Sequence, residues 1–364
     1  MFKKTLLGAV LVTALIFSGC VSYVSTPLSV QEGRLVTDAF GRQVEIPGEV
    51  ETIAAIGGAA RILTYAGCAD KLVGVTEMNK DNVSKMPFTV INAEHFAGIA
   101  SVSNGGPNET PFIEELIRVA PDVIFAQTDE STAQNVADKT GIPTVGIYPE
   151  GMFDETFYSA LELIGEIMGV EEHCSRVIDY IKECQADLDA RTKDIPDEGK
   201  PTVYTGAVSF SGAHGIDGTH ALYPPFTAIH AKNVVDEISN PKSVAFLVDM
   251  EKITMWDPDI IFLNPANMHL VNEDYAKNSA FYDNLKAVRN GELYSQIPYT
   301  CNWTNMELAI ADAYYAGKVI YPEQFADVDI IKKADEIFTV MLGQPFYEQL
   351  AADGYRFEKM TIGE

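Results

Sequence analysis

The stretch Glu171–Arg191, EEHCSRVIDYIKECQADLDAR, decides the fold, because it predicts one uninterrupted helix between two α/β patterns. Gly169 precedes this helix, and Pro196 ends the helical pattern after it. The apolar residues recur at steps of three and four and form one stripe. They are Cys174, Val177, Ile178, Ile181, Cys184 and Leu188. We expect a rigid rod of about 30 Å between two lobes. An ordinary amphipathic helix packed on one lobe is the alternative.

Short strands and helices alternate on both sides of this stretch, which predicts mostly parallel sheets with helices on both faces. The predicted fold class is therefore α/β, with two Rossmann-like lobes, each a mostly parallel sheet flanked by helices, joined by one long α-helix. The predicted boundaries are a lipoprotein signal peptide at 1–19, a tether at 20–33, an N-terminal lobe at 34–168, the linking helix at 169–195 and a C-terminal lobe at 196–364. In the second lobe, Thr304 and Glu307 predict a capping box for a helix over 305–316 that ends at Gly317.

The two halves of the chain repeat one another at one place. Glu114–Ala126, EELIRVAPDVIFA, aligns without gaps on Glu251–Leu263, EKITMWDPDIIFL. Pro121 corresponds to Pro258, an offset of 137 residues. In each copy a short helix stops at Pro-Asp and a buried strand begins. Chance similarity is the alternative, since this junction is common, but one copy on each side of the linking helix favours two similar lobes.

The N-terminus is a targeting segment, with Lys3 and Lys4 before an apolar run at 6–17. The run ends in Phe17-Ser18-Gly19-Cys20, which resembles a bacterial lipobox and predicts lipidation of Cys20. A plain secretory signal is the alternative. The formal net charge of −26 argues against nucleic acid and an anionic membrane surface as partners. No CxxC motif is present, and the pairing of Cys68, Cys174, Cys184 and Cys301 stays open.

These features together resemble the substrate-binding proteins of ABC importers for iron–chelate, haem and corrinoid complexes. The opening Val36–Pro47, VTDAFGRQVEIP, is similar to the usual start of that family, and Thr52–Gly58, Lys71–Val75 and the block at 114–125 follow in its order. The resemblance covers about residues 34–350. It implies a non-enzymatic, lipid-anchored receptor in the cell envelope. This receptor would be a monomer that holds a metal complex between its lobes, needs no cofactor, and delivers the complex to an ABC permease and its ATPase.

Ligands of open α/β sheets bind beyond the carboxyl ends of the strands, and the residues there mix aromatic side chains with a few polar groups. Gly57-Gly58 before a helix also resembles an anion-binding turn. The predicted ligand-binding residues are Gly57, Gly58, Arg61, Tyr148, His214, Tyr299 and Trp303. His214 and His220, with Asp217, form a second possibility for holding a transition metal, although solvated loop histidines fit the same pattern.

The family resemblance implies that Glu114 and Glu251 dock the permease, because an acidic residue at this point of each lobe meets permease arginines in that family. Glu109 is a nearby alternative in the first lobe. The ligand itself stays open. A receptor for a bare metal ion or oxyanion, such as nickel or molybdate, is the alternative to a metal chelate. An extracytoplasmic enzyme or chelatase is the third class, but no G-x-S-x-G, HExxH or CxxC motif supplies a nucleophile with its base.

Overall fold

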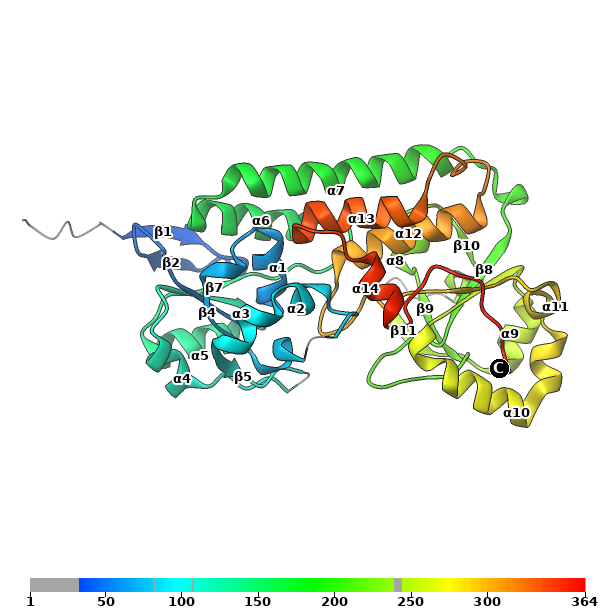
Figure 1. Ribbon diagram of the computed structural model, residues 1–364, viewed down its shortest axis with the longest axis horizontal. Helices are drawn as coiled ribbons and strands as arrows, with labels where there is room; N and C mark the ends of the chain where they lie inside the picture. Colours follow the sequence, from blue (N-terminus) through cyan, green and yellow to red (C-terminus); the bar gives the residue numbers. More distant parts are fainter. Residues whose placement is uncertain (1–32, 82, 107, 239–243, 364) are drawn as a thin grey trace, which may run out of the picture.

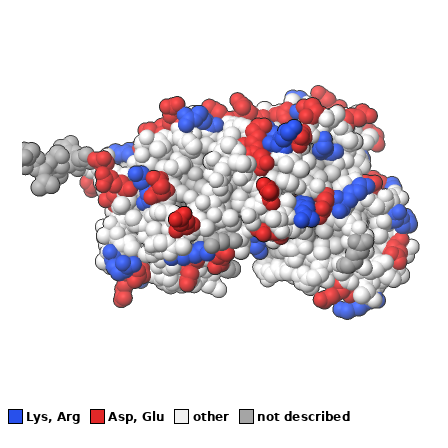
Figure 2. Space-filling view, in the orientation of Figure 1, with Lys and Arg blue, Asp and Glu red and all other residues white. Residues whose placement is uncertain are grey.

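The computed structural model describes residues 33–81, 83–106, 108–238 and 244–363. The predicted signal peptide and Cys20 lie outside the described residues. Two α/β lobes lie side by side, and the helix α7 (Glu171–Thr192) runs along both of them (Figure 1). Figure 2 shows the surface notched between the lobes on the side opposite α7, with acidic and basic side chains interspersed over this face. The predicted α/β class with two helix-joined lobes is confirmed.

The first lobe is built on five parallel strands in the order β5-β4-β3-β6-β7. The central strand β3 is wholly buried, as its apolar sequence IAAIG requires. Strand bounds are β3 Ile53–Gly57, β4 Leu72–Thr76, β5 Ala100–Ser103, β6 Val123–Gln127 and β7 Thr144–Gly146, with the antiparallel hairpin β1 Arg34–Thr37 and β2 Gln43–Ile46. Helix bounds are α1 Ala59–Tyr65, α2 Pro87–Ile91, α3 Ala93–Gly98, α4 Ile113–Val119, α5 Glu130–Thr140 and α6 Glu155–Met168.

The second lobe is built on four parallel strands in the order β10-β8-β12-β13. Strand bounds are β8 Thr202–Gly206, β10 Lys232–Asn233, β12 Ile260–Leu263 and β13 Leu293–Ser295. An antiparallel pair, β9 Gly218–Ala221 with β11 Val244–Leu247, stands apart from this sheet and is absent from the sequence prediction. Helix bounds are α8 Pro224–Thr227, α9 Met250–Trp256, α10 Met268–Asn284, α11 Lys286–Asn290, α12 Met306–Ile320, α13 Ile330–Leu342 and α14 Tyr347–Ala352.

The linking helix buries the predicted stripe. All six of its predicted apolar positions are buried, and Thr192 extends the same face. One hydrophobic cluster joins this face to both lobes, since it contains Phe125 of the first sheet, Ile181 of α7 and Phe262 of the second sheet. The helix is therefore part of a core that both lobes share. Among the described residues, no helix combines the length and the apolar content that crossing a membrane requires.

The internal repeat extends to the details of the backbone. Helices α4 and α9 are equal in length, and they are 137 residues apart, which is the offset of the sequence repeat. Each ends in a left-handed residue, Ala120 with φ 44° and Asp257 with φ 38°. In each copy the following Asp accepts hydrogen bonds from a Thr that opens a neighbouring strand: Asp122 from Thr52, and Asp259 from Thr202. Both copies share the helix, its left-handed C-terminal residue and the Asp–Thr hydrogen bonds, which makes chance similarity the weaker explanation.

The predicted capping box is wrong. Helix α12 begins after Asn305, whose side chain makes no capping hydrogen bond to it, and the helix continues past Gly317 to Ile320. Glu307 is fully buried and accepts a hydrogen bond from Tyr65 of the first lobe instead of reaching back to the cap. Gly317 permits close packing inside the helix, because a Cβ there would lie 2.4 Å from the Phe325 ring. Burial against a distant part of the chain overrides the local signal here.

The four cysteines of the described residues are all free thiols. Cys68, Cys174 and Cys184 are buried. Burial raises the pKa of Cys68 to about 12 and that of Cys174 to about 11, which keeps both as unreactive thiols at neutral pH.

Candidate functional site

The carboxyl ends of the first sheet converge where its strand order reverses, between β3 and β6, which is the position where open α/β sheets bind ligands. Gly57 ends β3 with φ +67°, and a Cβ on it would lie 2.0 Å from the carbonyl oxygen of Gln127 at the end of β6. Only glycine fits this backbone. The chain here is therefore built for close approach of two strand ends.

Four of the predicted ligand-binding residues, Gly57, Gly58, Tyr148 and Trp303, lie together at this edge. A Cβ on Gly58 would lie 2.6 Å from the Trp303 ring, although Trp303 belongs to the second lobe. Trp303 also meets Tyr148 edge to face, with ring centroids 5.7 Å apart. Asn302 and Trp303 both have positive φ, 47° and 79°, and the Asn302 carbonyl accepts a hydrogen bond from Arg61 of the first lobe. Aromatic surface from both lobes thus borders one strand edge.

Arg61 lies in the interior instead of facing open space. Its side chain is fully buried. It donates to Asn305 Oδ1 at 2.9 Å, to the carbonyl of Cys301 at 3.1 Å and to the carbonyl of Asn302, and its guanidinium lies over the Phe88 ring. Burial lowers its pKa. The observed contacts of Arg61 hold the two lobes together, and its predicted contact with a ligand remains a prediction.

The second lobe has its own cavity of about 150 Å³ at the carboxyl ends of its strands. Tyr299, a predicted ligand-binding residue, lines this cavity with Phe210 and Tyr223. Its polar lining is uncharged at neutral pH: it consists of Ser209, Asn264, Gln296, Thr300 and His220. Burial lowers the pKa of His220 to about 4, so the imidazole is neutral. The cavity offers aromatic faces and neutral hydrogen-bonding groups.

His214 is placed differently from the other predicted residues. Its ring stacks on Phe210 with centroids 4.1 Å apart, and its Nε2 lies 2.8 Å from the Phe210 carbonyl oxygen. Within the described parts of the chain, no three His, Cys, Asp or Glu side chains gather in a way that could hold a metal ion.

A carboxylate that the sequence prediction did not place at the ligand site sits at the edge of the first sheet. Glu109 Oε1 accepts hydrogen bonds from the Gly57 N–H at 2.7 Å and from the hydroxyls of Thr76 and Ser103. Sequence reasoning considered Glu109 only for docking. The polar residues Thr76 and Ser103 at the ends of adjacent strands are the signal that could have located it.

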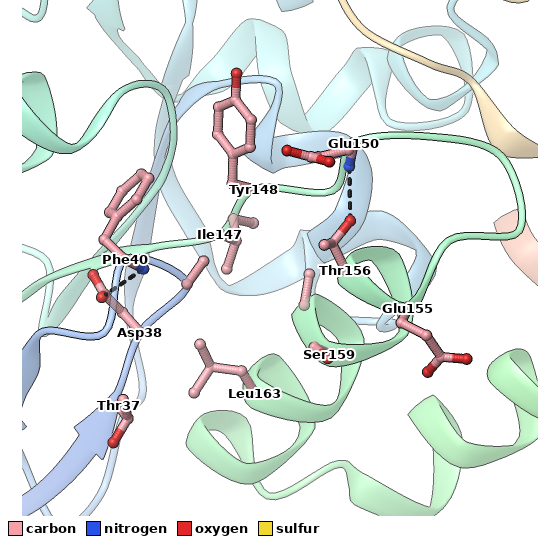
Figure 3. Close-up of a pocket in the computed structure, with 12 residues that line it drawn as sticks. Thr37, Asp38, Phe40, Ile147, Tyr148, Glu150, Glu155, Thr156, Ser159 and Leu163 are labelled. Carbon is pink, nitrogen blue, oxygen red and sulfur yellow. Dashed lines mark hydrogen bonds between the residues drawn. The ribbon is translucent and has the colours of Figure 1, made fainter. Parts of the chain in front are cut away.

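A larger cavity of about 510 Å³ lies in the first lobe between the β1–β2 hairpin, the segment after β7 and helix α6 (Figure 3). Tyr148 lines it together with Glu150 and Phe40, and the rings of Phe40 and Tyr148 are 6.2 Å apart. The Tyr148 ring therefore has one aromatic neighbour in this cavity, Phe40, and another, Trp303, at the strand edge.

The proposed docking residues occupy equivalent, exposed positions. Glu114 lies in the first turn of α4 and Glu251 in the first turn of α9. Glu109, the alternative in the first lobe, has its carboxylate turned to the Gly57 N–H. The geometry favours Glu114 over Glu109 for contact with another protein.

The fold agrees with the comparison to known proteins. The chain matches the family model described as periplasmic binding protein over residues 53–298, more than half of its length, and therefore belongs to that family. Within the family it is an extracytoplasmic substrate-binding protein of an ABC importer, which works with a permease and an ATPase.

Three relatives illustrate the range of the family. The Bacillus subtilis (strain 168) ABC transporter substrate-binding lipoprotein YvrC is 23% identical over 302 residues, covering 80% of this chain and 87% of the relative. The Fe(3+)-citrate-binding protein YfmC of the same organism is 24% identical, with coverage of 79% and 87%. The molybdate-binding protein MolA of Haemophilus influenzae is 20% identical, with coverage of 94% and 96%. Its molybdate-bound structure has a TM-score of 0.65 and covers 86% of this chain and 98% of its own.

Proposed function

We propose that this chain is a lipid-anchored, monomeric receptor that captures a metal complex between its lobes and delivers it to the permease without catalysing a reaction. The ligand class is a metal chelate of the iron–siderophore, haem or corrinoid type. The observation that carries this proposal is the contact of Trp303 with Gly58 and Tyr148, which brings aromatic surface from both lobes to one strand edge. The similarity to an Fe(3+)-citrate-binding protein supports the same class.

A receptor for a bare oxyanion is the second candidate, and the similarity to a molybdate-binding protein over 94% of this chain favours it. A bare oxyanion would be held mostly by backbone N–H groups. A bulky chelate would instead lie against the aromatic rings. The two candidates therefore differ in whether ligand binding changes the surroundings of Trp303.

Fluorescence titration and native mass spectrometry with metal analysis test the proposal together. The chain has two tryptophans, so Trp256→Phe isolates the signal of Trp303, and Trp303→Phe is the matched control. We expect a chelate to quench the fluorescence of the Trp256→Phe variant and to leave that of the Trp303→Phe variant unchanged. Binding of free molybdate or nickel, with no binding of any siderophore, haem or corrinoid complex, would refute the chelate proposal.

We propose further that Glu114 and Glu251 dock the permease. Both are exposed on helices that match in length, cap and offset, so they present two similar charges to a partner with two similar halves. Offsetting the helix dipole, worth about 0.3–1 kcal/mol for each residue, is the alternative role. The double variant Glu114→Arg, Glu251→Arg should abolish uptake while ligand affinity stays within about three-fold, a change of less than about 1 kcal/mol.

The matched control for docking replaces two other exposed acids, Glu130→Arg with Glu273→Arg, which carry the same change of net charge. This control should transport normally. Normal transport by the Glu114, Glu251 double variant, or equal loss in the control, would contradict the docking role.

The lipid anchor at Cys20 is supported by the lipobox-like sequence and by the relative named as a lipoprotein. Cys20→Ala should release the protein from the membrane fraction while ligand binding is retained. If the variant protein still sediments with membranes, the anchor lies elsewhere.

A further inference from the structure

The strand ends of the first sheet carry hydrogen-bond donors that could hold an anion, and the carboxylate of Glu109 occupies them. The Gly57 N–H, the Thr76 hydroxyl and the Ser103 hydroxyl belong to the ends of three neighbouring strands. The Gly57 N–H and the Ser103 hydroxyl donate to Glu109 Oε1, and the single hydrogen of the Thr76 hydroxyl is shared between Glu109 Oε1 and the Gly57 carbonyl, both at 3.2 Å. Thr76 and Ser103 are fully buried, so these donors have fixed positions. The donors that an oxyanion would use are therefore engaged by a carboxylate that carries its own negative charge.

The second oxygen of this carboxylate is available. Glu109 Oε2 has no hydrogen-bond partner among the described residues, and it lies 3.2 Å from the position that a Cβ on Gly57 would take. Glu109 is only partly buried. One oxygen fixes the side chain, and the other presents negative charge at the edge that Gly58, Tyr148 and Trp303 border.

Among the described residues, no Lys, Arg or His side chain forms an ion pair with Glu109. Arg61 is buried, and its Nε and one terminal nitrogen are engaged by Asn305, Cys301 and Asn302. The cavity of the second lobe is lined by neutral groups, as described above. The first-lobe cavity beside Tyr148 adds exposed Glu150 and Glu155, and the only other charged residue in its described lining, Asp38, is paired with Arg42 (Figure 3).

We propose that the cleft selects a metal complex that carries no net negative charge, cationic or neutral, and that Glu109 enforces this selection. The inference rests on the proposed function, because it concerns the same ligand site. A cationic chelate gains attraction to the Glu109 carboxylate. An anionic chelate or a free oxyanion has to approach a like charge or displace a carboxylate that already accepts hydrogen bonds from the Gly57 N–H and from neighbouring hydroxyls.

Binding of chemically matched iron chelates to the full chain tests the selection. The probes are ferrioxamine B as the cationic trihydroxamate complex, ferrichrome as the neutral one, ferric citrate as the anionic complex, and free molybdate. We expect ferrioxamine B and ferrichrome to bind and ferric citrate to bind at least about tenfold more weakly, which corresponds to about 1.4 kcal/mol. Added salt should weaken ferrioxamine B binding and leave ferrichrome binding nearly unchanged, since salt screens only charge attraction.

The variant Glu109→Gln keeps the shape and removes the charge. It should lower the preference for ferrioxamine B over ferric citrate by about tenfold or more. Glu130→Gln, an exposed acid on α5, is the matched control and should leave the preference unchanged. The salt dependence in the unaltered protein gives an independent reading if the Glu109→Gln variant proves unstable in a thermal melt.

The possible failures are distinguishable. Ferric citrate binding as tightly as ferrioxamine B would overturn the charge selection while supporting a chelate receptor. An unchanged preference in Glu109→Gln would also overturn it. Binding of molybdate alone, with no iron chelate bound, would overturn both the proposed function and the selection.

Discussion

Replacing Glu307 by Gln should change how the stability of the protein depends on pH. Glu307 is fully buried at the start of α12 and accepts a hydrogen bond from Tyr65 of α1, so it joins the second lobe to the first. Its other oxygen, Oε1, has no partner within the described residues. Gln has the same shape and can accept the Tyr65 hydrogen bond, but it does not titrate.

The magnitude follows from the two pKa values of this carboxyl. Burial raises the pKa of Glu307 from 4.5 to about 7 in the folded protein, against the opposing effects of the Tyr65 hydrogen bond and the positive charge of Arg61. Because the folded pKa is the higher one, the folded protein binds more protons, and the free energy of unfolding falls as pH rises between these values. The contribution is complete below about pH 4.5 and lost above about pH 7, and it amounts to about 3 kcal/mol at about 1.4 kcal/mol for each pKa unit.

Urea unfolding of both proteins across this range measures the effect. The difference in unfolding free energy between Glu307→Gln and the unaltered protein should change by about 3 kcal/mol in favour of the variant between about pH 4.5 and about pH 8. Burial also raises the pKa of Asp312, but this residue is the same in both proteins and cancels in the difference. Parallel stability curves, with a constant difference at every pH, would refute the assignment of a buried, titrating Glu307.

Two further substitutions test the strand edge and the repeat. Gly58→Ala places a methyl group 2.3 Å from Gln127 Oε1 and 2.6 Å from the Trp303 ring, so we expect a loss of about 1–3 kcal/mol in stability and a shift in Trp303 emission; an unshifted emission spectrum would contradict the contact. Asp122→Ala and Asp259→Ala each remove the hydrogen bonds between the Asp and a Thr at the start of a strand. Each substitution should lower the free energy of unfolding by about 1–3 kcal/mol. The two decreases in unfolding free energy should add to within about 0.5 kcal/mol in the double variant, because the two sets of hydrogen bonds share no partners. A larger departure from additivity in urea unfolding would show that the two sites are coupled.

The fold could be predicted because its signals are local and periodic. The stripe on α7 and the repeated helix–Pro-Asp–strand junction depend on residues near in sequence, and both are present in the structure. The pair β9–β11 was missed because a long stretch of chain separates Ala221 from Val244 and neither strand has an alternating pattern. Strand pairing over such a distance has no short-range signal.

Part of the arrangement of the candidate site could be predicted, because it too depends on residues near in sequence. Strand ends placed Gly57, Gly58 and Tyr148 at one edge of the first lobe, because the carboxyl ends of parallel strands lie together. The partnership of Arg61 with Asn305 joins residues 244 positions apart, and periodicity carries no information about it. The Glu109 carboxylate accepts hydrogen bonds from the strand ends of its own sheet, and the composition of the sequence does not reveal these contacts.

One segment of the second lobe, residues 299–305, both borders the proposed ligand site and makes hydrogen bonds to the first lobe. The Asn305 side chain accepts a hydrogen bond from Arg61 and also donates one to the carbonyl of Lys85 in the first lobe. Parting the lobes at this seam would break the hydrogen bonds of Arg61 to Asn305, Cys301 and Asn302. A hydrogen bond to a charged group contributes about 1.5–3 kcal/mol. The same segment carries Trp303, so a ligand that meets Trp303 meets a side chain whose backbone is fixed from the first lobe. In the proposed binding mode, the ligand therefore meets a surface that folding has already ordered, so binding does not have to supply the free energy of ordering it.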